Sequence, residues 1–175
     1  MIDTLLRAAV RDIADFPKPG IVFKDITPIL KDAKLCDAVV ESFIERLKGL
    51  DFDIIAGIES RGFLFGLMLA NRLGIPFVPI RKEGKLPSKT TKQSYDLEYG
   101  QATIEIHTDA FVPGTKVLLH DDLLATGGTL VAASKLIEQL GGKVAGFSFV
   151  ISLDFLKGRE RLMPFSEKLI SLVHY

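Results

Sequence analysis

The sequence has little of several features that would point to particular classes of protein. It contains one cysteine, Cys36, and no tryptophan among its 175 residues. One cysteine allows no intrachain disulfide and no cysteine-based zinc site, so we expect Cys36 to pack as a small apolar residue. Lys and Arg together number 22, as do Asp and Glu, and the formal net charge is therefore zero. A neutral chain argues against a general nucleic-acid or anionic-membrane surface.

Long apolar runs are also missing. No stretch reaches the length of a transmembrane helix. Residues 1–11 mix acidic and basic side chains in an amphipathic pattern, without the apolar run of a signal peptide. We therefore expect a soluble, cytoplasmic protein. With 47% hydrophobic and 25% charged residues, the composition is that of a globular chain. Its length predicts one domain, residues 1–175, with a core of its own.

Two common nucleotide-binding motifs are absent, but another phosphate site is present. The chain has neither the G-x-x-x-x-G-K-[ST] of a P-loop nor the G-x-G-x-x-G of a dinucleotide site. Residues 116–120 form the aliphatic run of a strand buried on both faces, and we expect that strand to end at Asp121 and Asp122. Residues 125–129, the Gly/Thr loop, lack bulky side chains, and a helix is expected over residues 130–140. Backbone amides in such a loop, at a helix N-terminus, bind phosphate.

The two acids before this loop indicate the kind of ligand. Carboxylates can bind the hydroxyls of a sugar while the loop binds its monophosphate, so a sugar phosphate is favoured over a nucleoside triphosphate. The run Asp121-Asp122-Leu123-Leu124-Ala125-Thr126-Gly127-Gly128-Thr129 resembles the phosphoribosyl-diphosphate motif of type I phosphoribosyltransferases. Its Leu-Leu-Ala-Thr-Gly-Gly-Thr part is similar to the adenine-specific members of that family. The alternative is an ordinary strand–turn–helix with two solvated aspartates.

The resemblance extends over nearly the whole chain and implies the fold. We expect an α/β protein with the type I phosphoribosyltransferase fold, in which helices flank a central, mainly parallel sheet. A flexible hood is expected as an insertion at about residues 82–107. Apolar periodicity predicts helices over residues 2–13, 35–47, 63–73 and 130–140. It predicts strands over residues 53–58, 75–81, 103–107, 116–120, 144–153 and 169–174.

A second turn follows the strand expected at residues 53–58. Ligands of open α/β sheets lie beyond the carboxyl ends of the strands, which is where Glu59-Ser60-Arg61-Gly62 is expected. This Glu-Ser-Arg-Gly turn resembles the family's pyrophosphate loop, which implies that Glu59, Ser60 and Arg61 contact the substrate. Arginine suits a diphosphate because its planar fork binds two oxygens. Without the resemblance, a helix-capping turn with an exposed arginine is an equal explanation.

Residues 21–28 follow a turn rich in proline and glycine. On the residues alone, a short edge strand that covers the core is the better interpretation. The stretch is similar to the segment with which the family holds its base. The resemblance implies that Val22 and Phe23 pack against the purine and that the backbone of Lys24 reads the purine's edge.

The hood is polar and has the length of an active-site lid. The resemblance places Arg81 and Lys85 at its entrance, where basic side chains meet the pyrophosphate. Few apolar contacts are expected to hold the hood, and its lysines have no obvious partner in the chain. We therefore expect the hood to become ordered when phosphoribosyl diphosphate binds. Without the resemblance, the favoured interpretation of the hood is a solvated charged loop.

Two further stretches resemble sequence motifs of the family. Residues 94–100 are similar to its Ser-Tyr-x-Leu-Glu-Tyr-Gly stretch, which implies roles for Glu98 and Tyr99 and makes Glu98 the candidate to handle the proton at adenine N7. On the residues alone, this is a strand with Glu98 in solvent. Residues 156–162 are similar to the closing Leu-x-Gly-Arg-x-x-Leu turn. His120 departs from the family pattern, and we expect it to be a hydrogen-bonded strand histidine.

The resemblance implies transfer of the 5-phosphoribosyl group from phosphoribosyl diphosphate to adenine, giving AMP and pyrophosphate. The implied catalytic residues are Glu98, Asp121, Asp122 and Arg61. The implied substrate-binding residues are Val22, Phe23, Lys24, Glu59, Ser60, Arg81, Lys85, Tyr99, Leu124, Ala125, Thr126, Gly127, Gly128 and Thr129. No protein group is expected to bind a metal directly, because Mg²⁺ would be held mainly by the substrate, with water linking it to the two aspartates. A homodimer is implied, with Arg81 able to reach the neighbour's site.

Two other functions stay open. One is transfer to another purine base, such as hypoxanthine or guanine. The other is a non-catalytic regulator that senses phosphoribosyl diphosphate, which would be expected to carry a DNA- or RNA-binding region. The zero net charge and the acid at position 98 favour the enzyme.

Overall fold

The computed structural model describes residues 2–97 and 100–175. The strands are β1 (Arg11–Ala14), β2 (Val22–Asp25), β3 (Ile54–Ile58), β4 (Phe77–Lys82), β5 (Thr90–Asp96), β6 (Gln101–His107), β7 (Lys116–Leu124), β8 (Lys143–Ser152) and β9 (Leu169–His174). The helices are α1 (Ile2–Ala9), α2 (Thr27–Leu30), α3 (Ala33–Leu47), α4 (Gly62–Leu73), α5 (Gly128–Gln139), the short 3-10 turn η1 (Asp154–Leu156) and α6 (Gly158–Leu162).

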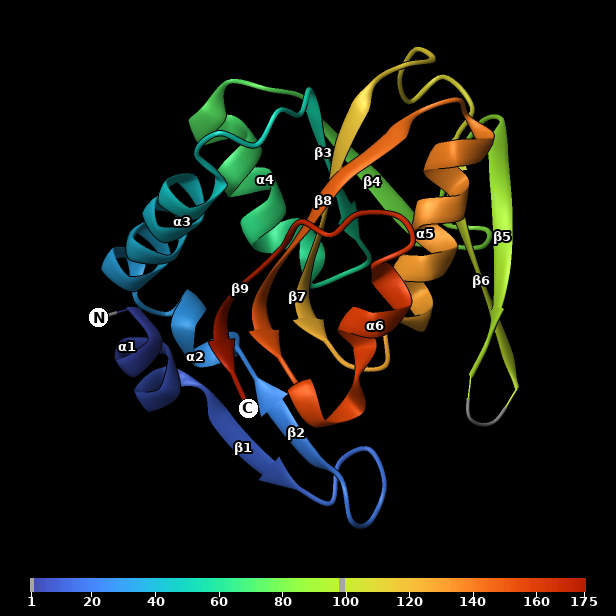
Figure 1. Ribbon diagram of the computed structural model, residues 1–175. Helices are drawn as coiled ribbons and strands as arrows, with labels where there is room; N and C mark the ends of the chain where they lie inside the picture. The colour runs from blue at the N-terminus through green and yellow to red at the C-terminus, as the bar shows by residue number, and fades with distance from the viewer. Residues whose placement is uncertain (1, 98–99) are drawn as a thin grey trace.

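The main sheet has seven strands in the order β5-β6-β4-β3-β7-β8-β9 (Figure 1). Strands β4, β3, β7, β8 and β9 run parallel, and β6 pairs antiparallel with both β4 and β5. All five residues of β3 are buried, as expected for a strand covered on both faces. The expected fold, a mainly parallel sheet flanked by helices with a hairpin in the hood, is confirmed.

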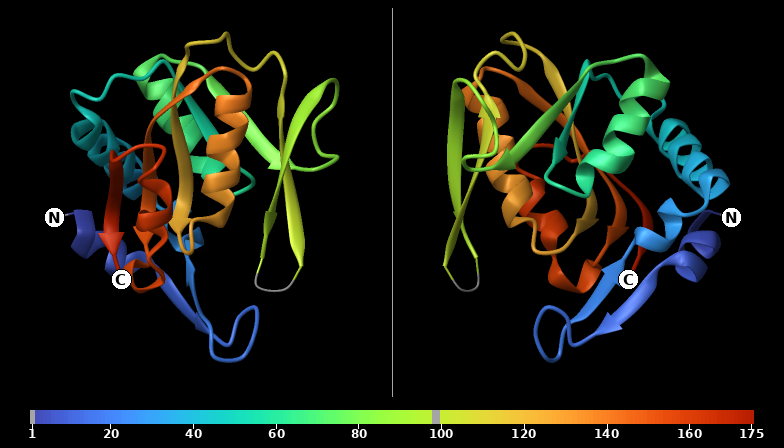
Figure 2. Two further views of the ribbon diagram at one scale, coloured as in Figure 1. Left: turned by 45° about the vertical axis from the view of Figure 1, so that its right-hand side comes forward. Right: turned by 180° about the vertical axis from the view of Figure 1, so that it is seen from behind.

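Helices cover both faces of this sheet (Figures 1 and 2). Helices α1 to α4 lie on one face, and α5 and α6 lie on the other. Alternate residues of β3 divide between the two cores: Ile55 packs with α3 and α4, whereas Ala56 packs with α5. Phe43 and Phe65 are fully buried in the first core, which stabilises the fold by about 1.5–3 kcal/mol for each ring. Cys36 packs there too, as expected.

Helix α3 shows why one boundary could be predicted. The side chain of Asp32 accepts hydrogen bonds from the backbone N–H groups of Lys34 and Leu35, at 3.0 and 3.1 Å. Asp32 is therefore the N-cap of α3, a position where aspartate is a preferred residue. Gly49 follows the helix at a φ of 81°, a conformation that favours glycine after a helix end.

Two expected boundaries are wrong. The first helix ends at Ala9 and not at Ile13, because residues 11–14 pair antiparallel with β2 and Ile13 lies opposite Phe23. The central strand β7 does not end at the aspartates. It continues to Leu124, because β8 pairs with it as far as Ser152. The aspartates therefore lie inside a strand, whose backbone bonds fix them.

The β1–β2 hairpin projects beyond the carboxyl ends of the parallel strands (Figure 1). Asp25 ties its base to the core. This carboxylate is 7% exposed, lies 2.6 Å from Arg11 Nη2, and accepts a hydrogen bond from the backbone N–H of Thr27. The hydrogen bond from Arg11 and that from Thr27 lower the pKa of Asp25 to about 2.

We predict that Asp25→Asn lowers the free energy of unfolding by about 1–2 kcal/mol at neutral pH, because charge-assisted hydrogen bonds are lost. The folded pKa of Asp25 lies below the unfolded value of 3.8, so its stabilisation is present above pH 3.8 and is lost as the pH falls toward 2. Urea denaturation at several pH values should therefore show the variant and the parent protein converging near pH 2. Asp12→Asn is the control, because its side chain is 57% exposed and should contribute less. Equal effects of the two changes at every pH would contradict this role.

Candidate functional site

The candidate site lies at the carboxyl ends of β3 and β7. These strands are adjacent and parallel, so the segments that follow them meet at one edge of the sheet. A cleft of about 450 Å³ opens there. Its lining comes from four segments that are far apart in the sequence: Phe16, Phe23, Glu59, Ser60, Arg61, Lys82, Asp121, Asp122 and Leu123. The structure thus brings the Glu-Ser-Arg-Gly turn, the acids and Phe23 together.

The two aspartates differ in their surroundings. Asp122 is 2% exposed, and its Oδ2 lies 2.8 Å from Nε of Arg61. Asp121 is more accessible, and its Oδ1 accepts a hydrogen bond from the backbone N–H of Asp122. Burial and the charge of Asp122 raise the pKa of Asp121 well above its usual range. Burial also raises the pKa of Asp122, against the lowering effect of Arg61. A positive charge brought into the cleft would favour the ionised form of both carboxyls.

Gly62 allows the Glu-Ser-Arg-Gly turn to approach the acids. A Cβ atom at this position would lie 2.7 Å from the carbonyl oxygen of His120 and 3.1 Å from Cα of Asp121. Both distances are shorter than ordinary contacts, so a side chain here would push α4 away from β7. The ion pair between Arg61 and Asp122 depends on that close approach.

Arg61 also contacts the β1–β2 hairpin. Its guanidinium lies 4.8 Å from the centroid of the Phe23 ring, in cation–π geometry. The Phe16 ring packs edge-on against Phe23, with 5.1 Å between the centroids. The arginine therefore lies between an aromatic surface on one side and the acids on the other. Such a site can hold a flat ring and an anion next to each other.

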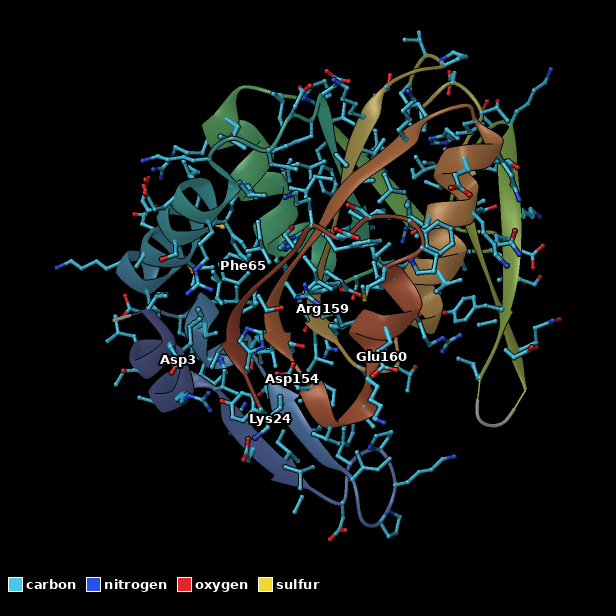
Figure 3. The ribbon with its side chains drawn as sticks, in the orientation of Figure 1. Asp3, Lys24, Phe65, Asp154, Arg159 and Glu160 are labelled. Carbon is cyan, nitrogen blue, oxygen red and sulfur yellow. The ribbon has the colours of Figure 1, made fainter. Side chains whose placement is uncertain are left out.

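The side chains of Val22 and Lys24 point away from this cleft. Nζ of Lys24 lies 2.7 Å from Asp12 Oδ1 and 3.8 Å from the centroid of the Tyr175 ring. Figure 3 shows Lys24 on the hairpin. Val22 lines a neighbouring hollow of about 570 Å³ with Thr126. The side chain of Lys24 thus contacts Asp12 and Tyr175 and is not directed at the cleft.

The Gly/Thr loop is supported by α6. A Cβ atom at Gly158 would lie 2.2 Å from the carbonyl oxygen of Ala125, so only glycine fits. Nη1 of Arg161 donates a hydrogen bond to the carbonyl oxygen of Thr126, at 3.2 Å. Helix α5 begins directly after Gly127, which has a φ of 78°. The sequence pattern at residues 156–162 gives no signal for these roles of Gly158 and Arg161, because their partners lie far away along the chain.

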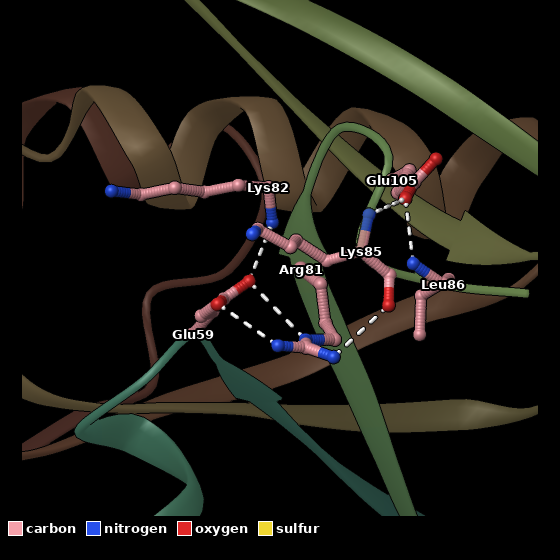
Figure 4. A network of polar contacts seen from close by, with 6 residues as sticks. All are labelled: Glu59, Arg81, Lys82, Lys85, Leu86 and Glu105. Carbon is pink, nitrogen blue, oxygen red and sulfur yellow. Dashed lines mark hydrogen bonds and ion pairs between the residues drawn. The ribbon is translucent and has the colours of Figure 1, made fainter.

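A network of carboxylates anchors the base of the hood (Figure 4). Glu59 binds the Arg81 guanidinium through both oxygens, at 3.1 and 3.3 Å, and accepts the backbone N–H of Lys82 at 2.8 Å. Glu105 is 2% exposed and accepts the backbone N–H groups of Lys85 and Leu86, both at 3.0 Å.

The network keeps both carboxyls ionised. Burial raises the pKa of Glu59, but the hydrogen bonds from Arg81 and Lys82 outweigh it, so the pKa lies below its usual value. For Glu105, burial is outweighed in the same way by hydrogen bonds from Leu86, Thr90 and Lys85. The turn at the start of the hood is therefore fixed by buried charge.

Two expectations about the hood can be compared with the structure, and a third falls on residues that it does not describe. Residues 90–96 form strand β5 and not loop, because they pair with β6 along their length. The expectation that its lysines lack partners is wrong for Lys92, whose Nζ lies 2.8 Å from Oε1 of Glu83. Glu98 and Tyr99 lie outside the described residues, between β5 and β6.

His120 does not face the cleft. It is fully buried beside the Phe43 ring, with Nδ1 2.8 Å from Oγ of Ser148. Burial lowers its pKa to about 3, so the imidazole is neutral at ordinary pH. Nε2 has no hydrogen-bond partner among the described residues. The expected strand histidine is therefore hydrogen-bonded through one nitrogen.

Within residues 2–97 and 100–175, no group of three His, Cys, Asp or Glu side chains could hold a metal ion. No helix in that part of the chain has both the length and the apolarity needed to cross a membrane. Asp121 and Asp122 are the carboxylates nearest to the Gly/Thr loop along the chain.

A buried and a partly buried acid, a small-residue loop at a helix N-terminus and an arginine turn at one sheet edge are the groups expected of a protein that binds sugar phosphates. Comparisons identify the class further. Residues 24–166 match the family model described as "Phosphoribosyl transferase domain". The adenine phosphoribosyltransferase of Cytophaga hutchinsonii is 53% identical over 175 residues, covering 100% of this chain and 97% of the relative.

Solved structures agree. The adenine phosphoribosyltransferase of Thermoanaerobacter pseudethanolicus superposes with a TM-score of 0.96 at 50% identity and covers 100% of both chains. The Saccharomyces cerevisiae enzyme, complexed with D-2,5-dideoxy-2,5-imino-altritol 1,6-bisphosphate and adenine, gives a TM-score of 0.92 at 40% identity over 98% of both chains. The chain therefore belongs to the phosphoribosyltransferase family and, within it, to the adenine phosphoribosyltransferases, which join adenine to the phosphoribosyl group in purine salvage.

We predict that Gly158→Ala displaces the Gly/Thr loop, because the new methyl group would meet the Ala125 carbonyl oxygen. The overpacking should cost about 1–3 kcal/mol of stability and should weaken AMP binding, measured by calorimetry. Gly146→Ala is a matched control, because a Cβ there would lie 2.9 Å from the carbonyl oxygen of Lys168, away from the cleft. It should lower stability without weakening AMP binding. Equal loss of affinity in the two variants would refute the specific role of Gly158.

Proposed function

We propose that the cleft at the carboxyl ends of β3 and β7 is the place where this chain transfers the phosphoribosyl group to adenine. The observation that carries the proposal is the convergence of the Gly/Thr loop, the Arg61–Asp122 ion pair and Phe23 at one sheet edge. A phosphate, a ribose and a flat base can be accommodated there in that order.

The Gly/Thr loop would bind the 5′-phosphate of the donor. Its backbone N–H groups, from Ala125 to Thr129, precede and open α5, where the helix dipole favours an anion. Leu124, the last residue of β7, would fix the start of the Gly/Thr loop relative to the sheet. Asp121 and Asp122 would accept hydrogen bonds from the ribose hydroxyls. As the bond at ribose C1 breaks, positive charge develops on the sugar, and the two carboxylates would stabilise it.

Basic groups around the Glu-Ser-Arg-Gly turn would bind the departing diphosphate. Ser60 and Arg61 lie at the cleft, and Arg81 lies beside Glu59 at the base of the hood. Lys85 is positioned by the bond from its backbone to Glu105. Bidentate donors such as the Arg81 fork match the geometry of diphosphate oxygens.

Mg²⁺ would be held mainly by the diphosphate and ribose oxygens, with water linking it to Asp121 and Asp122. The fit rests on the chemistry of the donors: two adjacent carboxylates, one buried and one partly buried, share a single nearby arginine and suit a hard cation. When bound, Mg²⁺ would neutralise charge on the leaving group.

The base would lie against the β1–β2 hairpin. The Phe23 ring faces the cleft and offers a flat apolar surface, while Val22 closes the neighbouring hollow. The backbone of Lys24 would read the edge of adenine. Glu98 would handle the proton at N7, with Tyr99 beside it.

The chain would act in the cytoplasm as a homodimer. Helix α4 exposes two leucines one turn apart: 40% of Leu64 and 55% of Leu67 are accessible. Apolar side chains that share an exposed helix face favour a protein partner. The same helix begins directly after Arg61, so a partner on α4 would lie near the cleft.

The first test measures AMP formation from phosphoribosyl diphosphate and adenine, with and without Mg²⁺, and with hypoxanthine and guanine as competing bases. We predict that Asp121→Asn combined with Asp122→Asn abolishes turnover and leaves the circular dichroism spectrum unchanged. Asp37→Asn combined with Asp51→Asn is the control, because these exposed acids lie elsewhere. Near-normal rates in the first variant would remove the acids from the mechanism, and equal use of hypoxanthine would overturn the preference for adenine.

The second test concerns assembly. We predict that sedimentation finds a dimer and that Leu64→Glu with Leu67→Glu shifts it to monomer, because four charges would be buried at a two-fold contact. Val112→Glu introduces charge at a side chain that is 73% exposed and should leave the dimer intact. A parent protein that sediments as a monomer with full activity would refute the homodimer.

A further inference from the structure

Strand β5 of the hood lies along helix α5 and contacts it through one face (Figure 1). Successive side chains of a strand point to opposite sides, so Thr91, Gln93 and Tyr95 share a face. Oγ1 of Thr91 donates to Oε1 of Gln139 at 3.2 Å, and Nε2 of Gln139 donates to Oε1 of Gln93 at 2.9 Å. These two contacts hold β5 to the far end of α5.

The third contact on this face reaches the Gly/Thr loop. Oγ1 of Thr129 donates a hydrogen bond to the Tyr95 hydroxyl, at 3.1 Å. The Tyr95 ring covers the adjoining backbone: its Cδ2 lies 3.7 Å from the position that a Cβ of Gly128 would occupy. The ring is partly buried against the core that includes Leu130. Tyr95 is therefore a hood residue in contact with the first turn of α5.

We propose that Tyr95 is a positioning residue that couples occupancy of the Gly/Thr loop to the position of the hood. The proposal rests on the proposed function, in which this loop binds the 5′-phosphate. The Thr129 hydroxyl can donate one hydrogen bond, and the Tyr95 hydroxyl accepts that bond when no anion is near. A phosphate is the stronger acceptor, so the Thr129 proton turns toward it, and the Tyr95 hydroxyl in turn donates to Oγ1 of Thr129.

This reversal strengthens the attachment of the hood. A hydrogen bond whose chain ends on an anion is stronger than one between two neutral hydroxyls, because each bond polarises the next. The ligand therefore favours the state in which β5 is docked on α5. It does so because the hydrogen bond between Tyr95 and Thr129 is stronger when the anion is bound than when it is absent.

The test uses Tyr95→Phe, which keeps the ring and removes the hydroxyl. We expect the KM for phosphoribosyl diphosphate to rise about three- to tenfold, while the KM for adenine stays unchanged, because adenine carries no phosphate. Ribose 5-phosphate should slow trypsin cleavage at the hood residues Lys89 and Lys92 in the parent protein. In Tyr95→Phe the rates with and without ribose 5-phosphate should be nearly equal.

Thr91→Val is the matched control. It removes a hydroxyl from the same face of the same strand, but its partner Gln139 lies at the far end of α5. Cleavage should then be faster both with and without ribose 5-phosphate, by the same factor, so the protection ratio should stay at the parent value. Equal loss of protection in Thr91→Val and Tyr95→Phe would show a docking contact alone and would overturn the proposal.

Thr129→Val provides a second route to the same conclusion. If the two hydroxyls act in series, Thr129→Val alone should abolish the protection, and adding Tyr95→Phe should have no further effect on ribose 5-phosphate affinity. Additive losses would overturn the coupling. If the parent protein binds ribose 5-phosphate but Tyr95→Phe keeps the parent protection ratio, the coupling through Tyr95 is wrong and the proposed phosphate site stands. A parent protein that does not bind it overturns the proposed phosphate site as well.

Discussion

The ion pair between Arg61 and Asp122 is the interaction on which the site depends. Asp122 is nearly inaccessible, and a buried carboxylate is costly unless a cation and hydrogen bonds compensate it. Arg61 supplies the cation and also covers the Phe23 ring. One guanidinium thus connects three segments: the turn after β3, the acids within β7 and the β1–β2 hairpin. Removal of Arg61 would leave the buried Asp122 without its cation and would remove the contact between Phe23 and the turn after β3.

Close backbone approach is the second constraint. Gly62 lets the start of α4 approach β7, and Gly158 lets α6 approach the Gly/Thr loop. Neither glycine has a positive φ, so each is required for space and not for backbone conformation. At these two positions even a methyl group would separate the elements that build the cleft. The positions of the ion pair and of the Gly/Thr loop therefore depend on these two glycines as well as on side-chain contacts.

Local pattern made part of this site predictable. The aliphatic run before Asp121, the small residues of the Gly/Thr loop and the Asp32 cap each produce their structure within a few residues, so the sequence contains the signal. The first helix and β7 were given wrong ends because Ile13 and Leu124 owe their conformation to distant strand partners. Glu105, Tyr95 and Arg161 were missed for the same reason: each binds a segment that no periodicity connects with it.

The two ends of the hood are held by different forces, and this difference bears on how it can move. At its base, the buried Glu105 and the partly buried Glu59 accept hydrogen bonds from backbone and arginine donors, so opening there would break charge-assisted hydrogen bonds. Along β5, the contacts with α5 are the partly buried ring of Tyr95 and hydrogen bonds between neutral side chains, and water can replace these hydrogen bonds at little cost. Motion of the hood should therefore be a swing of the β5–β6 hairpin about a fixed base. Because the base contains Arg81, the groups proposed to hold the diphosphate would stay in place while the far end of the hood opens to admit the substrate.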